Sequence, residues 1–298
     1  MRSKRLTYRP LPEFGRFRMR VIRTVAELRG WSREARRYGR SIGLVPTMGA
    51  LHEGHLSLVR AAKAGCDVVA ASIFVNPTQF GPNEDFSKYP RTWDADYALL
   101  EAEGVDVIFA PAPEEIYRTG AATFVEVAGL SDRLDGASRP GHFRGVATVV
   151  AKLFIAAEPD RAYFGQKDAA QVAVLRRMVA DLDLPVELAV QPIVREPDGL
   201  ALSSRNRYLS AEERRQALAL SQALRVAQEL AGSGERRSAE LIEAARQPFA
   251  SEPAIRVDYI AAVNWATLEP VDALVPGTLF AVAAFVGATR LIDNFVEA

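Results

Sequence analysis

The sequence predicts an α/β fold, in which a Rossmann-like, doubly wound parallel sheet is followed by a smaller α+β C-terminal domain. Up to Arg195, short unbroken apolar runs alternate with amphipathic helical segments, which is typical of a parallel sheet covered on both faces. After Arg195, a Glu-Pro-Asp-Gly turn at 196–199 precedes two long helical segments and two or three strands. We therefore expect a basic extension over 1–18, a Rossmann-like domain over 19–195 and a smaller domain over 196–298.

Periodicity and capping residues predict the individual elements. Thr24 and Glu27 have the spacing of a capping box, which opens the first helix, and Thr92 stands where it would cap a later one. Apolar spacing predicts helices over 24–38, 55–64, 93–103, 146–157, 169–182, 211–231 and 236–248. Apolar runs predict strands over 42–45, 68–75, 105–110, 162–164, 186–194, 256–263, 279–286 and 288–291, and 123–127 alternates like an edge strand.

Composition and charge exclude several classes of protein. Of 298 residues, 49% are apolar and 25% charged, which is unlike a disordered, collagen-like or disulfide-rich chain. Lys plus Arg and Asp plus Glu both number 37, so the whole chain has no electrostatic preference for nucleic acid or membrane. Cys66 is the single cysteine, and no apolar run reaches the roughly 18 residues of a membrane span. We expect a cytoplasmic protein without a membrane or nucleic-acid partner.

The first 18 residues are strongly basic, contain two prolines and lack helical periodicity. A solvated tail, or a start codon upstream of a natural start at Met19, explains them most simply. A nucleic-acid-binding arm and an organellar transit peptide are the alternatives that the sequence leaves open.

Two histidines lie in one turn, Pro46-Thr47-Met48-Gly49-Ala50-Leu51-His52-Glu53-Gly54-His55, between a predicted strand and a predicted helix. Ligands of open parallel sheets bind at the carboxyl ends of strands, where helix N-termini offer N–H groups to anions. The same helix end lowers the pKa of a histidine, so we expect both imidazoles to be neutral donors to a phosphate. We expect Gly54 to let the backbone approach the ligand closely. A zinc site fits less well, because these histidines are three residues apart, and a zinc-binding helix places them four apart.

Two further polar segments follow predicted strands and so reach the same edge of the sheet. One is Asn76-Pro77-Thr78-Gln79-Phe80, in which the Gln79 amide can donate to and accept from a hydroxy acid. The other is Phe164-Gly165-Gln166-Lys167-Asp168-Ala169-Ala170-Gln171. Lys167 supplies a point charge for a polyphosphate, and Asp168 can hold a ribose hydroxyl or a hydrated magnesium ion.

A fourth segment, Leu202-Ser203-Ser204-Arg205, stands at the start of the predicted second domain. Hydroxyls followed by a guanidinium are suited to clamping phosphate oxygens from the far side of a cleft. Tyr89, Asp96 and the turn around His142 lie between the other segments, and turns of this kind are more often structural than catalytic.

These four segments, in this order, closely resemble the pantoate–β-alanine ligase family of the nucleotidyltransferase superfamily, which carries the His-x-Gly-His phosphate signature. The resemblance runs from about Met19 to the C-terminus. It implies a homodimeric ligase that uses ATP and Mg²⁺ to condense pantoate with β-alanine through a pantoyl-adenylate, releasing pyrophosphate and then AMP. It also implies that residues 19–195 bind ATP and pantoate and that 196–298 form a lid.

Residue by residue, the resemblance assigns the phosphate contacts and the catalytic roles to His52, His55, Lys167, Ser203 and Arg205. Further implied ATP contacts are Pro46, Thr47, Met48, Gly165, Asp168, Val194, Leu202 and Ser204. Gln79, Gln171 and Met48 are implied to bind pantoate, and Asp96 is the candidate metal ligand. This chain departs from the family pattern at Ala169, Ala170 and Leu202, and Ala95 interrupts the acidic run that contains Asp96.

A nucleotidyltransferase that charges a larger acceptor such as RNA, using the basic N-terminus, is the alternative function. The body of the chain lacks a basic patch interleaved with aromatic residues, which disfavours this alternative.

Overall fold

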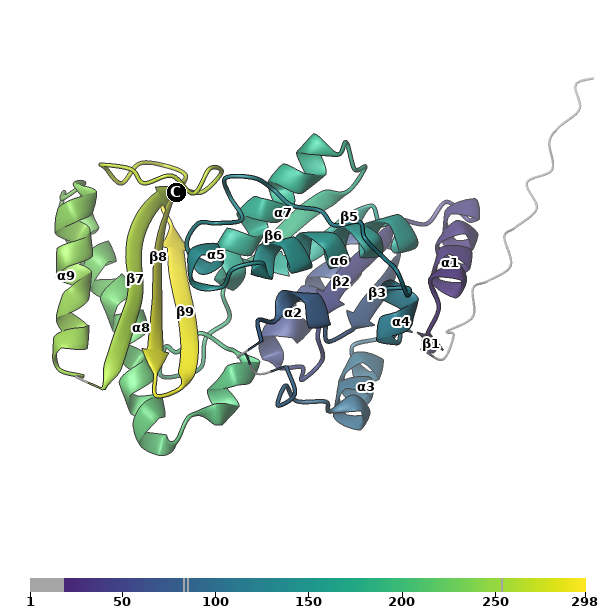
Figure 1. The fold of residues 1–298 in the computed structure, drawn as a ribbon, viewed down its shortest axis with the longest axis horizontal. Helices are drawn as coiled ribbons and strands as arrows, with labels where there is room; N and C mark the ends of the chain where they lie inside the picture. The colour runs from purple at the N-terminus through teal and green to yellow at the C-terminus, as the bar shows by residue number, and fades with distance from the viewer. Residues whose placement is uncertain (1–18, 83, 85, 253) are drawn as a thin grey trace, which may run out of the picture.

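The structure is a computed structural model that describes residues 19–298 except 83, 85 and 253, so the basic segment over 1–18 lies outside the described residues. Its larger part is a parallel six-stranded sheet in the order β1-β4-β3-β2-β5-β6 (Figure 1). The strands are β1 (Arg20–Ile22), β2 (Ile42–Thr47), β3 (Val68–Ile73), β4 (Val107–Phe109), β5 (Arg161–Gly165) and β6 (Glu187–Gln191).

Helices cover both faces of this sheet, which confirms the predicted doubly wound α/β class. On one face, α2 (Glu53–Gly65) and α3 (Trp93–Ala102) pack against side chains such as Val45 and Val69. On the other face, α1 (Val25–Arg37), α6 (His142–Ala157) and α7 (Ala169–Asp181) cover the alternate side chains of the same strands. The short helices are η1 (Pro77–Gln79), α4 (Pro113–Ile116), α5 (Asp135–Ser138), η2 (Gln166–Asp168) and η3 (Ser204–Tyr208).

The C-terminal part is an antiparallel sheet in the order β7-β8-β9, covered by two long helices on its outer side (Figure 1). Its elements are α8 (Ala211–Gly232), α9 (Ser238–Ala250), β7 (Ile255–Asn264), β8 (Thr278–Val286) and β9 (Thr289–Val296). This arrangement confirms the expected smaller α+β unit, and the boundary at 195 stays a prediction. Within the described residues, no helix combines the length and the apolar character that a bilayer crossing requires.

The structure differs from the prediction at the 123–127 segment, at the edge of the large sheet and at the N-cap of α3, and the short helices α4 and α5 were not predicted. The 123–127 segment is not a strand, because the backbone N–H of Val125 donates to the Thr148 hydroxyl (2.9 Å) and not to a neighbouring strand. The edge position beside β4 is held instead by β1, which is short and was not predicted. Thr92 occupies the N-cap of α3, but its hydroxyl donates to the Asp96 carboxylate (3.1 Å) and makes no cap bond to the backbone.

Sheet topology brings the predicted polar segments to one edge. The loops after β2, β3 and β5 leave the carboxyl ends of neighbouring central strands, since β2 pairs with both β3 and β5. The start of α6 backs onto the second of these loops, and the close contact involves Gly145. A Cβ at Gly145 would lie 2.3 Å from the Thr78 carbonyl oxygen.

We predict that Gly145→Ala destabilises the fold by about 1–3 kcal/mol or more, because backbone has to move to admit the methyl group. Gly30→Ala is the matched control. Gly30 is exposed within α1 and has nothing within 4 Å of its Cβ position, so the change should stabilise the helix by up to about 1 kcal/mol. Denaturant unfolding of both variants measures the difference, and equal midpoints would contradict the close packing of α6 on η1.

Candidate active site

The histidine turn is held by hydrogen bonds from the backbone to the imidazole rings. His52 is the N-cap of α2, and its Nδ1 accepts a hydrogen bond from Gly54 N (3.2 Å). The Nδ1 of His55 accepts one from His52 N (3.4 Å), which completes a reciprocal capping box. A ring nitrogen that accepts carries no proton in the neutral imidazole, so the proton of each ring sits on Nε2. Both rings are therefore set as Nε2–H donors.

Gly54 has a role within the histidine turn that the sequence did not predict. A Cβ at this position would lie 2.9 Å from Cε1 and 3.0 Å from Nδ1 of His52. The glycine thus makes room for the His52 ring, which could not otherwise fold back onto the helix start. The contact that requires glycine in the structure is with this ring, and the expected approach of the backbone to a ligand stays a prediction.

Burial keeps both imidazoles neutral. Burial, followed by the nearby Lys167, lowers the pKa of His52 to about 4. Burial also lowers the pKa of His55 to about 3, with contributions from His52 and Lys167. These pKa values agree with the predicted neutral state, and burial is the main physical cause, whereas the sequence argument relied on the helix end.

Asp96 holds the loop that leads into this turn. Its side chain is 2% exposed, and its carboxylate accepts hydrogen bonds from the backbone N–H groups of Ala50 (3.0 Å) and Leu51 (2.8 Å). Thr92 supplies a third donor to the same carboxylate. These bonds occupy both oxygens, so the arrangement does not support the expected metal role. Asp96 is better described as a residue that positions the turn.

A small cavity of about 180 Å³ lies between the sheet edge and α6. Asn76, which is 1% exposed, donates from Nδ2 to Gln79 Oε1 (3.0 Å), and this orients the Gln79 amide so that its Nε2 donates to Met48 Sδ (3.1 Å). Predicted site residues that line the cavity are Pro46, Thr47, Met48, His55, Gln79, Asp168, Gln171 and Arg205. Apolar side chains of α6 form another wall, so the cavity suits a compact molecule with both polar and branched apolar parts.

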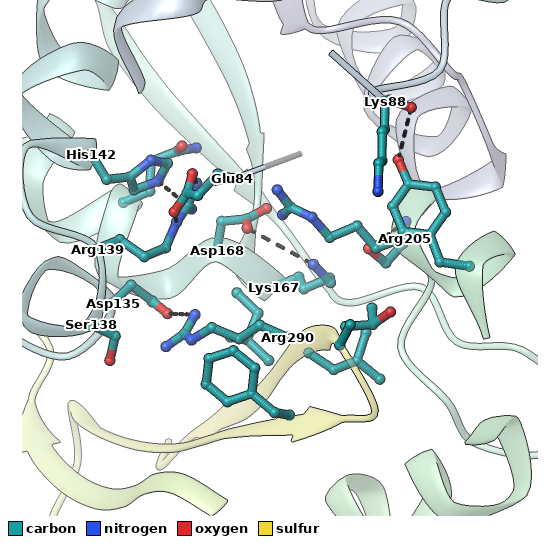
Figure 2. A pocket seen from close by; sticks show the side chains of 18 of the residues that line it. Glu84, Lys88, Asp135, Ser138, Arg139, His142, Lys167, Asp168, Arg205 and Arg290 are labelled. Carbon is teal, nitrogen blue, oxygen red and sulfur yellow. Dashed lines mark hydrogen bonds and ion pairs between the residues drawn. The ribbon is translucent and has the colours of Figure 1, made fainter. Parts of the chain in front are cut away.

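A larger cavity of about 750 Å³ opens between the six-stranded sheet and the C-terminal unit. Figure 2 shows Lys167 and Asp168 in its middle, with 3.9 Å between Lys167 Nζ and Asp168 Oδ1, and Arg205 to one side. Ser203 also lines it, and Gln171 lies on the boundary between the two cavities. Asp168, Gln171 and Arg205 line both cavities, so the two spaces adjoin.

The residues that line these two cavities do not include five of the predicted ATP contacts, which are His52, Gly165, Val194, Leu202 and Ser204. The Ser204 hydroxyl is 3.3 Å from the Tyr89 hydroxyl, and Val194 O accepts a hydrogen bond from Leu202 N (3.0 Å). Leu202 also reaches the histidine turn, since its Cβ lies 3.8 Å from the Cβ position of Gly54. Gly165 ends β5 directly before η2, which carries Lys167 and which we call the lysine loop.

Arg139 and His142 are functional candidates that the sequence reasoning missed or treated as structural. Both line both cavities, and Arg139 holds Glu84 through two bonds of 2.7 Å (Figure 2). His142 Nδ1 donates to Gln79 O (2.9 Å), while its Nε2 accepts from Arg139 (3.0 Å). Burial, followed by Arg139, lowers the pKa of His142 to about 4. The available signal was the position of His142 in a Gly-rich turn directly before a helix.

Anion-binding groups that converge on the carboxyl edge of a doubly wound sheet are typical of a nucleotide-binding protein. The family model described as Pantoate-beta-alanine ligase matches residues 20–296, and the chain belongs to this family. The chain is accordingly a ligase that uses ATP to condense pantoate with β-alanine.

Relatives in sequence and in structure agree with this assignment. The pantothenate synthetase of Acidobacterium capsulatum is 65% identical over 287 residues, which cover 93% of this chain and 96% of the relative. That of Koribacter versatilis is 58% identical over 278 residues, with the same coverage of both chains. The crystal structure of pantothenate synthetase from Thermus thermophilus has 49% identity and a TM-score of 0.88, covering 93% of this chain and 99% of that chain.

We predict that His55→Gln weakens the dependence of stability on pH. The pKa of His55 is about 3 in the folded chain and near 6.5 when unfolded, so the unfolded chain binds more protons as the pH falls below 6.5. The stability conferred by the neutral ring is complete above pH 6.5 and declines between there and about pH 3. Thermal unfolding from about pH 7 to about pH 5 should show a smaller loss for the variant. Parallel curves for the two proteins would show that burial does not hold this ring neutral.

Proposed function

We propose that the condensation proceeds through a pantoyl-adenylate formed where the two cavities adjoin. A pantoate carboxylate oxygen attacks the α-phosphorus of ATP in line, and the bond to pyrophosphate breaks. The β-alanine amine then attacks the acyl carbon, and AMP leaves as pantothenate forms. Such a sequence needs no nucleophilic side chain, only positioned substrates and stabilised phosphate charge.

The observation that carries this proposal is the fixed Nε2–H orientation of His52 and His55 beside Lys167. Neutral imidazole donors, a helix N-terminus and a lysine together suit the phosphates of ATP. Ser203, Ser204 and Arg205 would contact the phosphates from the opposite wall. The remaining proposed ATP contacts are Pro46, Thr47, Met48, Gly165, Asp168, Val194 and Leu202.

Pantoate would occupy the smaller cavity. The Gln79 amide, oriented by Asn76, and the Gln171 amide would bind its hydroxyls and carboxylate, while Met48 and α6 would contact its methyl groups. A ligase from Francisella tularensis, 34% identical with a TM-score of 0.76, was solved in complex with "Beta-gamma ATP and Beta-alanine". This complex supports ATP and β-alanine as ligands of the present chain.

Magnesium fits the cleft as a companion of ATP. No group of three His, Cys, Asp or Glu side chains among the described residues is placed to form a cation cage. Mg²⁺ usually takes phosphate oxygens, water and only one or two carboxylates, and Asp168, half exposed beside Lys167, can provide one. When bound, the ion would neutralise phosphate charge.

Two wider assignments belong to the same proposal. The family resemblance supports a homodimer, and the single cysteine is consistent with work in the reducing cytoplasm. The balanced charge favours small substrates over nucleic acid as partners.

Exchange of labelled pyrophosphate into ATP tests the adenylate directly, because it needs pantoate but not β-alanine. We predict exchange that depends on pantoate, and a loss of about 100-fold or more in His52→Ala or His55→Ala, the scale for one preorganised donor. Circular dichroism and thermal unfolding serve as the folding control. Wild-type exchange in either folded variant would contradict the phosphate role, and exchange that required RNA in place of pantoate would support the alternative function.

Calorimetric titration separates the two cavities. We predict that Lys167→Ala weakens binding of a nonhydrolysable ATP analogue, since it removes a phosphate contact, and changes pantoate binding less. Gln79→Ala and Gln171→Ala should weaken pantoate and largely retain the nucleotide. The reverse pattern would mean that the two cavities hold the opposite ligands.

A further inference from the structure

The loop that carries Lys167 is held by a side chain from the C-terminal sheet. Asn294, on β9, donates from Nδ2 to the carbonyl oxygens of both Gln166 (3.1 Å) and Lys167 (2.9 Å). Its Oδ1 accepts a hydrogen bond from Gln166 Nε2 (3.2 Å). One amide thus holds two successive peptide groups and one side chain of η2. We call this set of three hydrogen bonds the Asn294 clasp.

The clasp is itself rigidly supported. Asn294 is 3% exposed, and its backbone N–H donates to Asp293 Oδ1 (2.8 Å). Asp293 is 2% exposed and receives two bonds from Arg195, of 2.6 and 2.9 Å. Asn294 also pairs with Ala281 within the antiparallel sheet. Its amide therefore has little freedom to move.

The lysine loop has little such support from its own side chains. Gly165, at the N-cap of η2, offers no side chain, and Asp168, at the N-cap of α7, makes no capping hydrogen bond. A second bond from the C-terminal unit holds the next turn, since Trp265 Nε1 donates to Ala169 O (2.9 Å). The C-terminal unit thus fixes the backbone on which the Lys167 ammonium is carried.

We infer that Asn294 is a positioning residue for the adenylation step, acting through Lys167. This inference rests on the proposed phosphate role of Lys167. Displacement of a charged group by about 1 Å can slow a reaction by about 100-fold, so the clasp controls the rate without touching ATP. The inference implies that β9 stays hydrogen-bonded to the lysine loop during the adenylation step.

The test compares Asn294→Ala and Asn294→Asp with Leu241→Ala. The aspartate variant keeps the size of the side chain but places oxygen where the two carbonyls require a donor. Leu241 is fully buried in α9, so its truncation destabilises the same unit through packing and leaves the clasp intact. Hydrogen–deuterium exchange of peptides covering 165–171 and pyrophosphate-exchange kinetics are measured for all three variants.

Both Asn294 variants should speed amide exchange over 165–171. They should also lower kcat/KM for ATP by about 10- to 100-fold, with a smaller effect on the KM for pantoate. Leu241→Ala should do neither at a temperature where all variants are folded. Unchanged amide exchange in the Asn294 variants, or equal effects of Leu241→Ala, would overturn the inference.

A double-mutant cycle with Lys167→Ala decides whether Asn294 acts through the lysine. If it does, adding Asn294→Ala to Lys167→Ala changes the rate of pyrophosphate exchange by less than about twofold. If the rate losses of the two single variants instead multiply in the double variant, the inference is overturned. Lys167→Ala alone tests the proposed phosphate role. Full activity in that single variant would remove the proposed role of Lys167, while the amide-exchange comparison still decides whether Asn294 holds the loop.

Discussion

Two backbone N–H groups at the start of α2 fix the tautomers of both histidines of the candidate site. By donating to the Nδ1 atoms of His52 and His55, they place the ring protons on Nε2, and burial keeps both rings uncharged. The histidines can then contribute directed hydrogen bonds without adding fixed positive charge. That charge comes from Lys167 and Arg205, which reach the same region from separate elements. The directed hydrogen-bond donors and the positive charges are thus carried by different side chains.

Three of the groups at the cleft are held by hydrogen bonds from or to buried polar side chains. The histidine turn depends on Asp96, the Gln79 amide on Asn76, and the lysine loop on Asn294. All three are at most 3% exposed, so their hydrogen bonds meet little competition from water. The conformational entropy of these groups is therefore lost during folding and not when a ligand binds.

The strongly periodic elements of the fold could be predicted from the sequence, because apolar runs and capping residues report local structure. The 123–127 segment misled the prediction, since alternation alone does not show that the Val125 N–H bonds to Thr148. In the site, the loops after β2, β3 and β5 meet because these strands are neighbours in a parallel sheet. The polar residues of these loops could therefore be predicted from the sequence as candidate site residues. Arg139 was not, because its partner Glu84 lies 55 residues away and only the folded chain brings them together.

Helix α6 serves at once as the inner layer of the fold and as a wall of the smaller cavity. Val146, Val149 and Val150 line that cavity while belonging to the main apolar cluster, where each is at most 6% exposed. The shape of this wall of the cavity is thus set by side chains that also pack the helix against the sheet. Substituting smaller residues for these valines, to admit a bulkier acid, would leave cavities in the apolar core and lower the stability of the fold. A change of substrate preference at this wall would therefore require compensating substitutions in the same layer.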